Sequence, residues 1–424
     1  MLNKRNVGSF GRMPWLVLSL VLCLAMIGEA KTVLTVAGHQ TTWNVVGPIA
    51  REYMALHSDV EIEHLYIRTD NYDGMNKILA MTAGGELPDI IHASLSLSPE
   101  LLAANIILPV PEDIAADIQR IFLPPLIPTV TYQGKIMGIP TENQTYVLGY
   151  NQRLFEEVGL VGAPQTWDDL AAYAKKLTRA DGQGNVIQRG FGISGVTDYL
   201  RFSHTFINLL WSNGGVYIDD DMVAHLTDPA ARETVQFLRD IYAPGYLSFS
   251  DSMRNERAAM ASTPTYYRGS LMNLHDYDRM RTTVMPNNRG PKVAYQYGWA
   301  MFASNNNNPQ KQAIVWDFLR YLTMELLDDG TTRMGNQLID LVGALPASRT
   351  DLSRAIFRTD PFFGGFIDSL AVSRAEPLIP QVNLRLDELF KAVKPAIEGK
   401  ISVAQAVEDA QMRITNNLAN FKNK

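Results

Sequence analysis

Segments that alternate between strand and helix patterns run along most of this 424-residue chain. Residues 32–37 (TVLTVA) have the length and apolar content of a buried strand, and the apolar residues of 45–54 recur at helical spacing. Residues 60–66 alternate between apolar and polar as a half-exposed strand does, and 75–82 return to helical spacing. Repeated strand–helix–strand units predict an α/β fold in which ligands bind beyond the carboxyl ends of the strands.

Four later apolar patterns with helical spacing follow residues that favour a helix start: Thr166, Asp228, Asn308 and Ser402. The second and third are followed by proline, which is favoured at the first helical position. Ser402 has Gln405 three residues on, the spacing of a capping box. We expect a helix to begin directly after each of the four.

The first 30 residues have the pattern of an export signal. Three basic residues lie within the first 12, an apolar run follows over 15–27, and small residues close the segment at Ala30. The apolar run is too short to cross a hydrocarbon core, which needs about 20 residues. We therefore expect 1–30 to be a signal peptide that directs the chain to the periplasm; a membrane anchor or a buried helix is the alternative.

The only cysteine of the chain, Cys23, lies inside this segment. Leu22 precedes it, whereas a lipid-anchored cysteine follows a small residue, so a lipid anchor at Cys23 is the less favoured interpretation. A mature chain without cysteine has neither disulfides nor thiolate chemistry.

Removal of 1–30 shortens the chain from 424 to 394 residues, a length that suits two lobes better than one core. It also changes the net charge from −6 to −8. An acidic exported chain is a poor partner for nucleic acid or for an anionic membrane surface, which attract clustered Lys and Arg. No later apolar run approaches 18 residues.

Catalytic motifs do not stand out. The sequence has no Gly-x-Ser-x-Gly elbow, no phosphate-binding loop and no His-Glu-x-x-His helix, and its seven histidines are not at metal-ligand spacing. We therefore expect no catalytic residues, no metal and no cofactor. Two carboxylates placed for glycoside hydrolysis leave no sequence signature, so that chemistry stays open.

Nine short segments occur in an order that is typical of one family. They are 83–91 (AGGELPDII), 134–140 (GKIMGIP), 148–151 (LGYN), 166–170 (TWDDL), 211–215 (WSNGG), 258–260 (AAM), 298–301 (GWAM), 343–346 (GALP) and 404–414. With them the chain resembles the extracellular solute-binding proteins (family 1) of sugar-importing ABC transporters, the group that includes maltose-binding protein. The resemblance extends over almost the whole mature chain.

The resemblance implies a two-lobed periplasmic binding protein fold of the class II type, each lobe a mainly parallel sheet flanked by helices. It also implies a monomer that closes on one sugar or oligosaccharide and delivers it to the transmembrane permease subunits of an ABC importer. The chain crossings of the family fall near 140–141, 296–298 and 344–346. The implied lobes are 31–140 plus 297–345, and 141–296 plus 346–424.

Candidate ligand contacts in the first lobe follow two predicted strands. His39 and Gln40 could form hydrogen bonds with a sugar and Trp43 could stack on it, because sugars present paired hydroxyls and flat C–H faces. The alternative is that the first two cap a helix and that Trp43 belongs to the core. His92 and Ser94 follow the next strand and are further candidates.

Polar residues directly follow the first predicted crossing. Glu142, Asn143 and Gln144 are hard to explain as core residues, so we expect them to form hydrogen bonds with the ligand, an exposed loop being the alternative. Gln144 matches the position of a cleft glutamate in the family.

Aromatic residues supply the candidates of the second lobe. Tyr199 and His204 lie in a segment that carries ligand contacts in the family. Tyr266 matches a tryptophan position that stacks on sugar, so we predict that its ring is a stacking platform. Tyr297 and Trp299 lie beside the second crossing and complete the set.

The ligand identity stays open, because Ala93, Ser96, Leu97 and Leu386 depart from the maltose-binding branch. One alternative keeps the fold and changes the ligand: adjacent tyrosines could bind ferric iron, and cleft carboxylates could bind a polyamine. An alternative of another class is a secreted carbohydrate-active enzyme.

Overall fold

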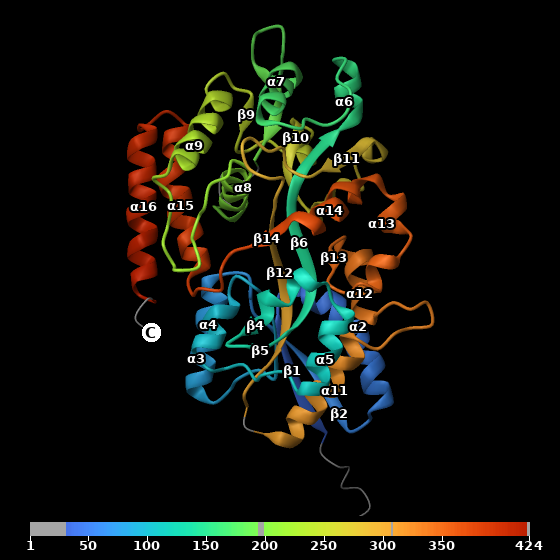
Figure 1. The fold of residues 1–424 in the computed structure, drawn as a ribbon. Helices are drawn as coiled ribbons and strands as arrows, with labels where there is room; N and C mark the ends of the chain where they lie inside the picture. Colours follow the sequence, from blue (N-terminus) through green and yellow to red (C-terminus); the bar gives the residue numbers. More distant parts are fainter. Residues whose placement is uncertain (1–30, 194–198, 307, 422–424) are drawn as a thin grey trace, which may run out of the picture.

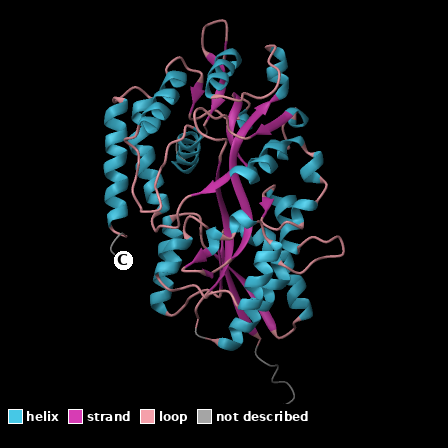
Figure 2. Cartoon of the chain, in the orientation of Figure 1, coloured by secondary structure: helices cyan, strands magenta, loops and turns pink. Residues whose placement is uncertain are grey.

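The computed structural model describes residues 31–193, 199–306 and 308–421, so the predicted signal peptide lies outside the described residues. Figure 1 shows two bodies, one above the other, with long strands running from one to the other. Strands occupy the middle of the molecule and helices flank them (Figure 2). Within the described ranges, none of the helices has both the length and the apolar character that crossing a bilayer requires.

The helices and strands follow the expected alternation. The strands are β1 (Thr32–Gly38), β2 (Val60–Tyr66), β3 (Ile90–Ser94), β4 (Thr131–Tyr132), β5 (Lys135–Ile136), β6 (Ile139–Asn151), β7 (Arg179–Ala180), β8 (Val186–Gly192), β9 (Leu247–Ser248), β10 (Ala258–Pro264), β11 (Met280–Thr283), β12 (Ala294–Ala303), β13 (Leu345–Pro346) and β14 (Ser373–Ala375). The helices are α2 (Gln40–Leu56), α3 (Tyr72–Gly84), α4 (Ser98–Ala103), α5 (Glu112–Ile121), α6 (Gln152–Glu157), α7 (Trp167–Leu177), α8 (Tyr199–Ser212), α9 (Pro229–Tyr242), α10 (Arg268–Leu271), α11 (Pro309–Thr323), α12 (Arg333–Gln337), α13 (Ile356–Thr359), α14 (Gly364–Ser369), α15 (Val382–Ile397) and α16 (Val403–Ala419).

All four predicted helix starts are confirmed: α7, α9, α11 and α16 begin directly after Thr166, Asp228, Asn308 and Ser402. The first and last of these residues form complete capping boxes, and the third accepts a hydrogen bond from a backbone N–H of the first turn. Asp228 makes no side-chain cap bond, so that helix start depends on the proline that follows it.

One twisted sheet joins the two bodies, with its strands in the order β2-β1-β3-β12-β6-β10-β8-β7. The pairs β1–β2, β1–β3 and β8–β10 are parallel, as the strand–helix–strand pattern predicts. The antiparallel pairs β3–β12, β12–β6 and β6–β10 involve the long strands β6 and β12, which connect the two bodies, and the two-residue edge strand β7 is antiparallel to β8. The sheet is therefore mainly parallel away from the long strands and antiparallel around β6 and β12.

The three predicted crossing segments lie side by side near the middle of β6. Gly298 of β12 pairs with Asn143 on one side of β6, and Leu345 and Pro346 of β13 pair with Asn143 and Glu142 on the other. The first half of β6 thus pairs with β12 and β13, and its second half pairs with β10 and β11 in the other body. Three segments that are distant in the sequence meet at the boundary between the bodies.

Apolar side chains form a separate core in each body. One core lies in the lower body of Figure 1 and draws its residues from 34–139 and 300–347, around β1, β3 and the start of β6. The other core lies in the upper body and draws its residues from 146–295 and 379–418, including residues of α8, α15 and α16. A smaller cluster, rich in phenylalanine, packs on the other face of the upper half of β6 and contains Phe357, Phe362, Phe363 and Phe366. Among the described residues, the two main cores have no buried residue in common, as two separate lobes require.

A close approach of backbones at Gly298 gives a first testable prediction. A Cβ added to Gly298 would lie 2.4 Å from the carbonyl oxygen of Glu142, so any side chain would push β12 away from β6. We expect Gly298→Ala to lower the free energy of unfolding by about 1–2 kcal/mol, the lower range for overpacking. Gly182→Ala is the matched control, since nothing lies within 4 Å of its added Cβ. Equal denaturant midpoints for the two variants would contradict this close packing.

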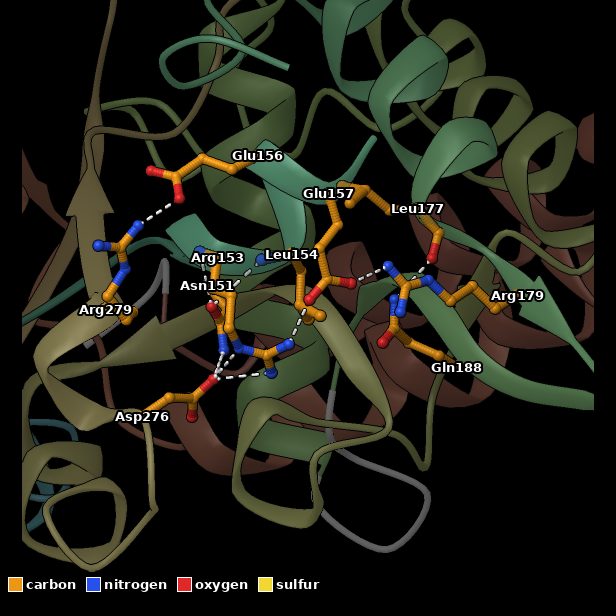
Figure 3. Close-up of polar contacts among 10 residues, drawn as sticks. All are labelled: Asn151, Arg153, Leu154, Glu156, Glu157, Leu177, Arg179, Gln188, Asp276 and Arg279. Atoms are coloured by element: carbon orange, nitrogen blue, oxygen red, sulfur yellow. Dashed lines mark hydrogen bonds and ion pairs between the residues drawn. The ribbon is translucent and has the colours of Figure 1, made fainter. Parts of the chain in front are cut away.

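A network of charged side chains holds the far end of the upper body together (Figure 3). Arg153 of α6 donates from Nε and Nη2 to Asp276 Oδ2, at 3.1 and 3.0 Å, and also pairs with Glu157. Arg179 of β7 pairs with the other oxygen of Glu157. Asn151 donates to the same oxygen of Asp276. The charges in this network are paired with one another, and we assign it a structural role.

Candidate ligand-binding cleft

A cavity of about 610 Å³ lies between the two bodies. Its lining residues are His39, Thr41, Thr42, Val45, Arg68, Asp70, Asn71, His92, Ser94, Ser96, Glu142, Gln144, Tyr146, Tyr199, Leu200, Arg201, His204, Tyr266, Tyr297, Trp299, Met334, Leu338 and Val342. The volume falls in the range of small-molecule sites, about 300–1,000 Å³. We refer to this cavity as the cleft.

Alternate residues of the two long strands form the floor of the cleft. Glu142, Gln144 and Tyr146 of β6 are two positions apart, so their side chains leave the same face of the strand. Trp299 pairs with Glu142 and Tyr297 pairs with Gln144 across to β12. The floor therefore presents a carboxyl group and an amide beside three aromatic side chains, and all of them stand on strands rather than on loops.

The polar groups of the floor are only partly satisfied. Glu142 Oε2 accepts a hydrogen bond from Gln144 Nε2 at 2.9 Å, whereas Gln144 Oε1 is buried and has no partner among the described residues. Within the described part of the chain no cationic side chain pairs with Glu142, and burial raises the pKa of its carboxyl to about 7. A ligand that brings hydrogen-bond donors would satisfy both acceptors.

His92 lies in the middle of β3 rather than after it, and each of its ring nitrogens already has a partner. Thr141 Oγ1 donates its hydrogen to the carbonyl oxygen of Trp299 at 3.0 Å, so it accepts from His92 Nε2 at 2.9 Å. Thr42 Oγ1 then donates to Nδ1 at 2.8 Å, which defines the tautomer. Burial lowers the pKa of His92 to about 3, so the ring stays neutral. His92 links α2, β3, β6 and β12, and only its carbon atoms are left for a ligand.

His204 of α8 differs, because neither ring nitrogen has a hydrogen-bond partner among the described residues although the side chain is buried. Its ring stacks on Tyr295 with centroids 4.2 Å apart and lies 5.2 Å from the ring of Tyr297. Tyr295 in turn donates from its hydroxyl to Glu376 at 2.5 Å. Burial lowers the pKa of His204 to about 3, so it offers one donor and one acceptor to the cleft.

Tyr266 stands at the other wall of the cleft, half-buried, in a short 3₁₀ turn after β10. Its hydroxyl oxygen accepts from Arg201 Nε at 3.1 Å, and the same guanidinium donates to the buried Tyr267. Arg201 thus binds both phenol oxygens. Within the described residues, no group of three or more His, Cys, Asp or Glu side chains could hold a metal ion.

In the lower body, the edge of the cleft is formed by residues at the starts of α2 and α3. His39 caps α2 by accepting from the backbone N–H of Thr41 at 3.2 Å, and its ring also borders the cleft. Arg68 and Asp70 form an ion pair of 2.7 Å in the turn after β2. Ser94 Oγ lies 2.9 Å from Ser96 Oγ beneath them. Tyr199, the first residue of α8, completes the opposite rim.

Three of the residues predicted from the sequence do not border the cleft. Gln40 is exposed and donates to Asn44. Trp43 stacks on His64 with ring centroids 5.0 Å apart. Asn143 is buried on the opposite face of β6, where it accepts from Gln296 Nε2 at 3.0 Å. The other ten, from His39 to Trp299, are brought together around one cavity.

Several lining residues were not anticipated from the sequence. Arg68 and Asn71 follow β2 as His39 follows β1, so the same rule of polar residues at strand ends could have found them. Met334 and Leu338 are apolar residues at helical spacing, which carry no signal that separates them from core residues.

Comparison with known proteins assigns the family. Residues 44–325, more than half of the chain, match the family described as bacterial extracellular solute-binding protein. The chain belongs to this family, whose members are binding proteins of bacteria that act outside the cytoplasm.

The curated relatives are distant. A Brucella abortus (strain 2308) protein named as a binding protein is 26% identical over 288 residues, which cover 65% of this chain and 66% of that protein, just under two thirds of its length. The sn-glycerol-3-phosphate-binding periplasmic protein of Escherichia coli (strain K12) is 25% identical over 330 residues, 72% of this chain and 74% of that protein.

Solved structures share the two-lobed fold. Maltose-bound MalE3 of T. maritima superposes with a TM-score of 0.77 at 19% identity, covering 91% of this chain and 99% of that chain. The cyclic α-maltosyl-1,6-maltose binding protein of Arthrobacter globiformis gives a TM-score of 0.75 at 20% identity, covering 92% of this chain and 100% of that chain. The fold is therefore the two-lobed binding-protein fold that the sequence predicts.

Proposed function

We propose that this protein is the ligand-binding component of an ABC importer, which binds a sugar or oligosaccharide in the cleft and delivers it to transmembrane permease subunits. The observation that carries the proposal is the floor of the cleft. Gln144 Oε1 and both ring nitrogens of His204 are buried without partners among the described residues, next to the aromatic side chains of Tyr297 and Trp299. The paired hydroxyls of a sugar would form hydrogen bonds with these polar atoms, and its C–H face would pack on the aromatic rings.

The ten cleft-lining candidates are the proposed ligand contacts, and their roles differ. Gln144, Glu142 and His204 form hydrogen bonds with hydroxyls, and Tyr266, Tyr297 and Trp299 supply ring faces. The remaining four, His39, His92, Ser94 and Tyr199, shape the walls. The names of the structural neighbours, which include maltose-bound MalE3, support a saccharide ligand.

The lobes in this proposal are 31–140 plus 297–345, and 141–296 plus 346–424, with hinges where the three segments meet beside Asn143. Closure of a cleft about such segments excludes water from the hydrogen bonds of the ligand. The protein acts as a monomer in the periplasm after cleavage behind Ala30. Intact-mass analysis of exported protein tests this, since a lipid-bearing species that begins at Cys23 would contradict it.

A phosphorylated polyol is the second candidate ligand. Arg68 and Arg201 both border the cleft, and one relative is named as a binding protein for sn-glycerol 3-phosphate. The adjacent tyrosines argue less for iron, because Arg201 donates to both phenol oxygens.

Calorimetric titration distinguishes these ligands. We expect binding with one site per chain and a micromolar dissociation constant, about −8 kcal/mol, for at least one saccharide in a panel of mono- to tetrasaccharides. If glycerol 3-phosphate binds and no saccharide does, the ligand is the phosphorylated polyol and not a sugar. Turnover of an oligosaccharide during incubation would identify an enzyme instead.

A further inference from the structure

A second cavity, of about 440 Å³, adjoins the cleft and shares the lining residues Thr41 and Val342 with it. Its other lining residues are Trp43, Asn44, Pro48, Arg51 and Leu341. Thr41 belongs to the first turn of α2, and Val342 ends the π-helical segment Leu338–Val342 that follows α12. Because the two residues border both spaces, the second cavity lies directly beside the cleft, along the side of α2. We call it the α2 groove.

The α2 groove combines an apolar surface with planar polar groups. The Leu341 side chain is 55% exposed and Pro48 is half-buried beside it in the lining. Arg51 is exposed and has no hydrogen-bond or ion-pair partner among the described residues. Apolar patches accept the C–H face of a sugar, and a guanidinium fork donates to neighbouring hydroxyls. The groove thus places apolar and polar groups side by side, as the floor of the cleft does.

Trp43 gives the groove a wall that is held in place. Its indole lies parallel to the His64 ring, with an angle of 3° between the planes. Gly47 packs against the indole so closely that a Cβ there would lie 3.1 Å from it. A ring held between two neighbours contributes a rigid wall, which lowers the entropy cost of binding a flexible ligand.

We propose that the α2 groove is a second sugar subsite and that the ligand is an oligosaccharide longer than a disaccharide. One end of it is enclosed in the cleft, and the chain extends between Thr41 and Val342 to lie on Leu341 and Arg51. This inference rests on the proposed function, because the occupant of the groove is the continuation of the occupant of the cleft.

Affinity as a function of ligand length tests the subsite. The probes are two linear series from disaccharide to pentasaccharide, α-1,4-linked glucose and β-1,4-linked mannose, titrated calorimetrically into the full mature chain. The variant is Leu341→Asn combined with Arg51→Gln, two exposed changes that leave the cores intact. Leu326→Asn is the matched control, since that leucine is 54% exposed and borders neither cavity.

We expect the longest bound member of a series to bind at least fivefold more tightly than its disaccharide. The double variant should reduce this ratio below twofold and leave disaccharide affinity unchanged, while Leu326→Asn keeps the wild-type ratio. A wild-type ratio near one, or a ratio that the double variant does not change, overturns the subsite and leaves the proposed function standing. Absence of binding to every member of a wider saccharide panel overturns the proposed function itself.

Discussion

Glu142→Gln is expected to stabilise the ligand-free protein at alkaline pH and to leave it unchanged at acid pH. Burial raises the pKa of the Glu142 carboxyl to about 7, above the ordinary value of 4.5. A carboxyl whose pKa is raised by folding stabilises the folded state below pH 4.5, and this contribution is lost as the pH rises through 7. The glutamine variant avoids the loss, so its free energy of unfolding at pH 8 should exceed that of the wild type by about 1–3 kcal/mol.

Denaturant unfolding between pH 4 and pH 8.5 measures this difference. Glu112→Gln, a change at an exposed carboxylate of α5, is the control and should follow the wild-type curve. Glu100, whose pKa burial also raises to about 7, is present in every variant and cancels in the comparison. Parallel wild-type and Glu142→Gln curves over the whole range would show that the floor of the cleft does not bury an uncompensated carboxylate.

Tyr266→Ala is expected to weaken sugar binding by about 1–3 kcal/mol, the range of an aromatic hot spot. The ring is half-buried at the wall of the cleft, so its removal should change the unfolding of the ligand-free protein little. The neighbouring Tyr267 is only 1% exposed, and its truncation should cost about 3–5 kcal/mol of stability, as for other buried aromatic residues. Calorimetry and thermal melting of the two variants separate the roles.

Tyr266→Phe refines this prediction. The phenylalanine variant keeps the ring and removes the hydroxyl that accepts from Arg201 Nε. If the ring stacks on the ligand, the phenylalanine variant should bind within a few-fold of the wild type. A large loss of stability in Tyr266→Ala with unchanged affinity would remove Tyr266 from the site.

Sequence patterns located the elements well because the relevant signals are local. A strand needs only a short run of apolar residues, and a capping residue acts within one helical turn, so β1, β2 and the starts of α7 and α16 followed directly. The pairing of β6 with both β12 and β13 is not local. The ordered motifs that resemble one family implied where the three segments lie in the sequence, but not that they pair with one another.

The sequence was less reliable for the site residues than for the helices and strands, because side-chain direction and tertiary contacts decide which residues reach the cleft. Alternation along β6 places Asn143 opposite Glu142 and Gln144, so the period of a strand could have excluded it. His92 was a candidate ligand contact, yet both of its ring nitrogens form hydrogen bonds with threonines from other elements. Contacts of that kind depend on the tertiary fold and leave no mark on the sequence.

The wall of the cleft that contains Tyr266 also depends on contacts that the sequence does not show. Arg201 lies beside Tyr266 because α8 and the turn after β10 approach each other, although 65 residues separate them along the chain. Val342 borders both the cleft and the α2 groove and looks like an ordinary core residue in the sequence. The chemistry of the strand ends was predictable, whereas the apolar walls and the position of the arginine required the structure.

Small-angle scattering of the mature protein with and without saccharides tests the central claim, that two lobes close on one sugar. We predict that at least one saccharide lowers the radius of gyration, that this compaction saturates with one ligand per chain, and that Tyr266→Ala shifts it to higher ligand concentration. An unchanged radius of gyration for every mono-, di- and oligosaccharide, together with no calorimetric heat, would contradict the account.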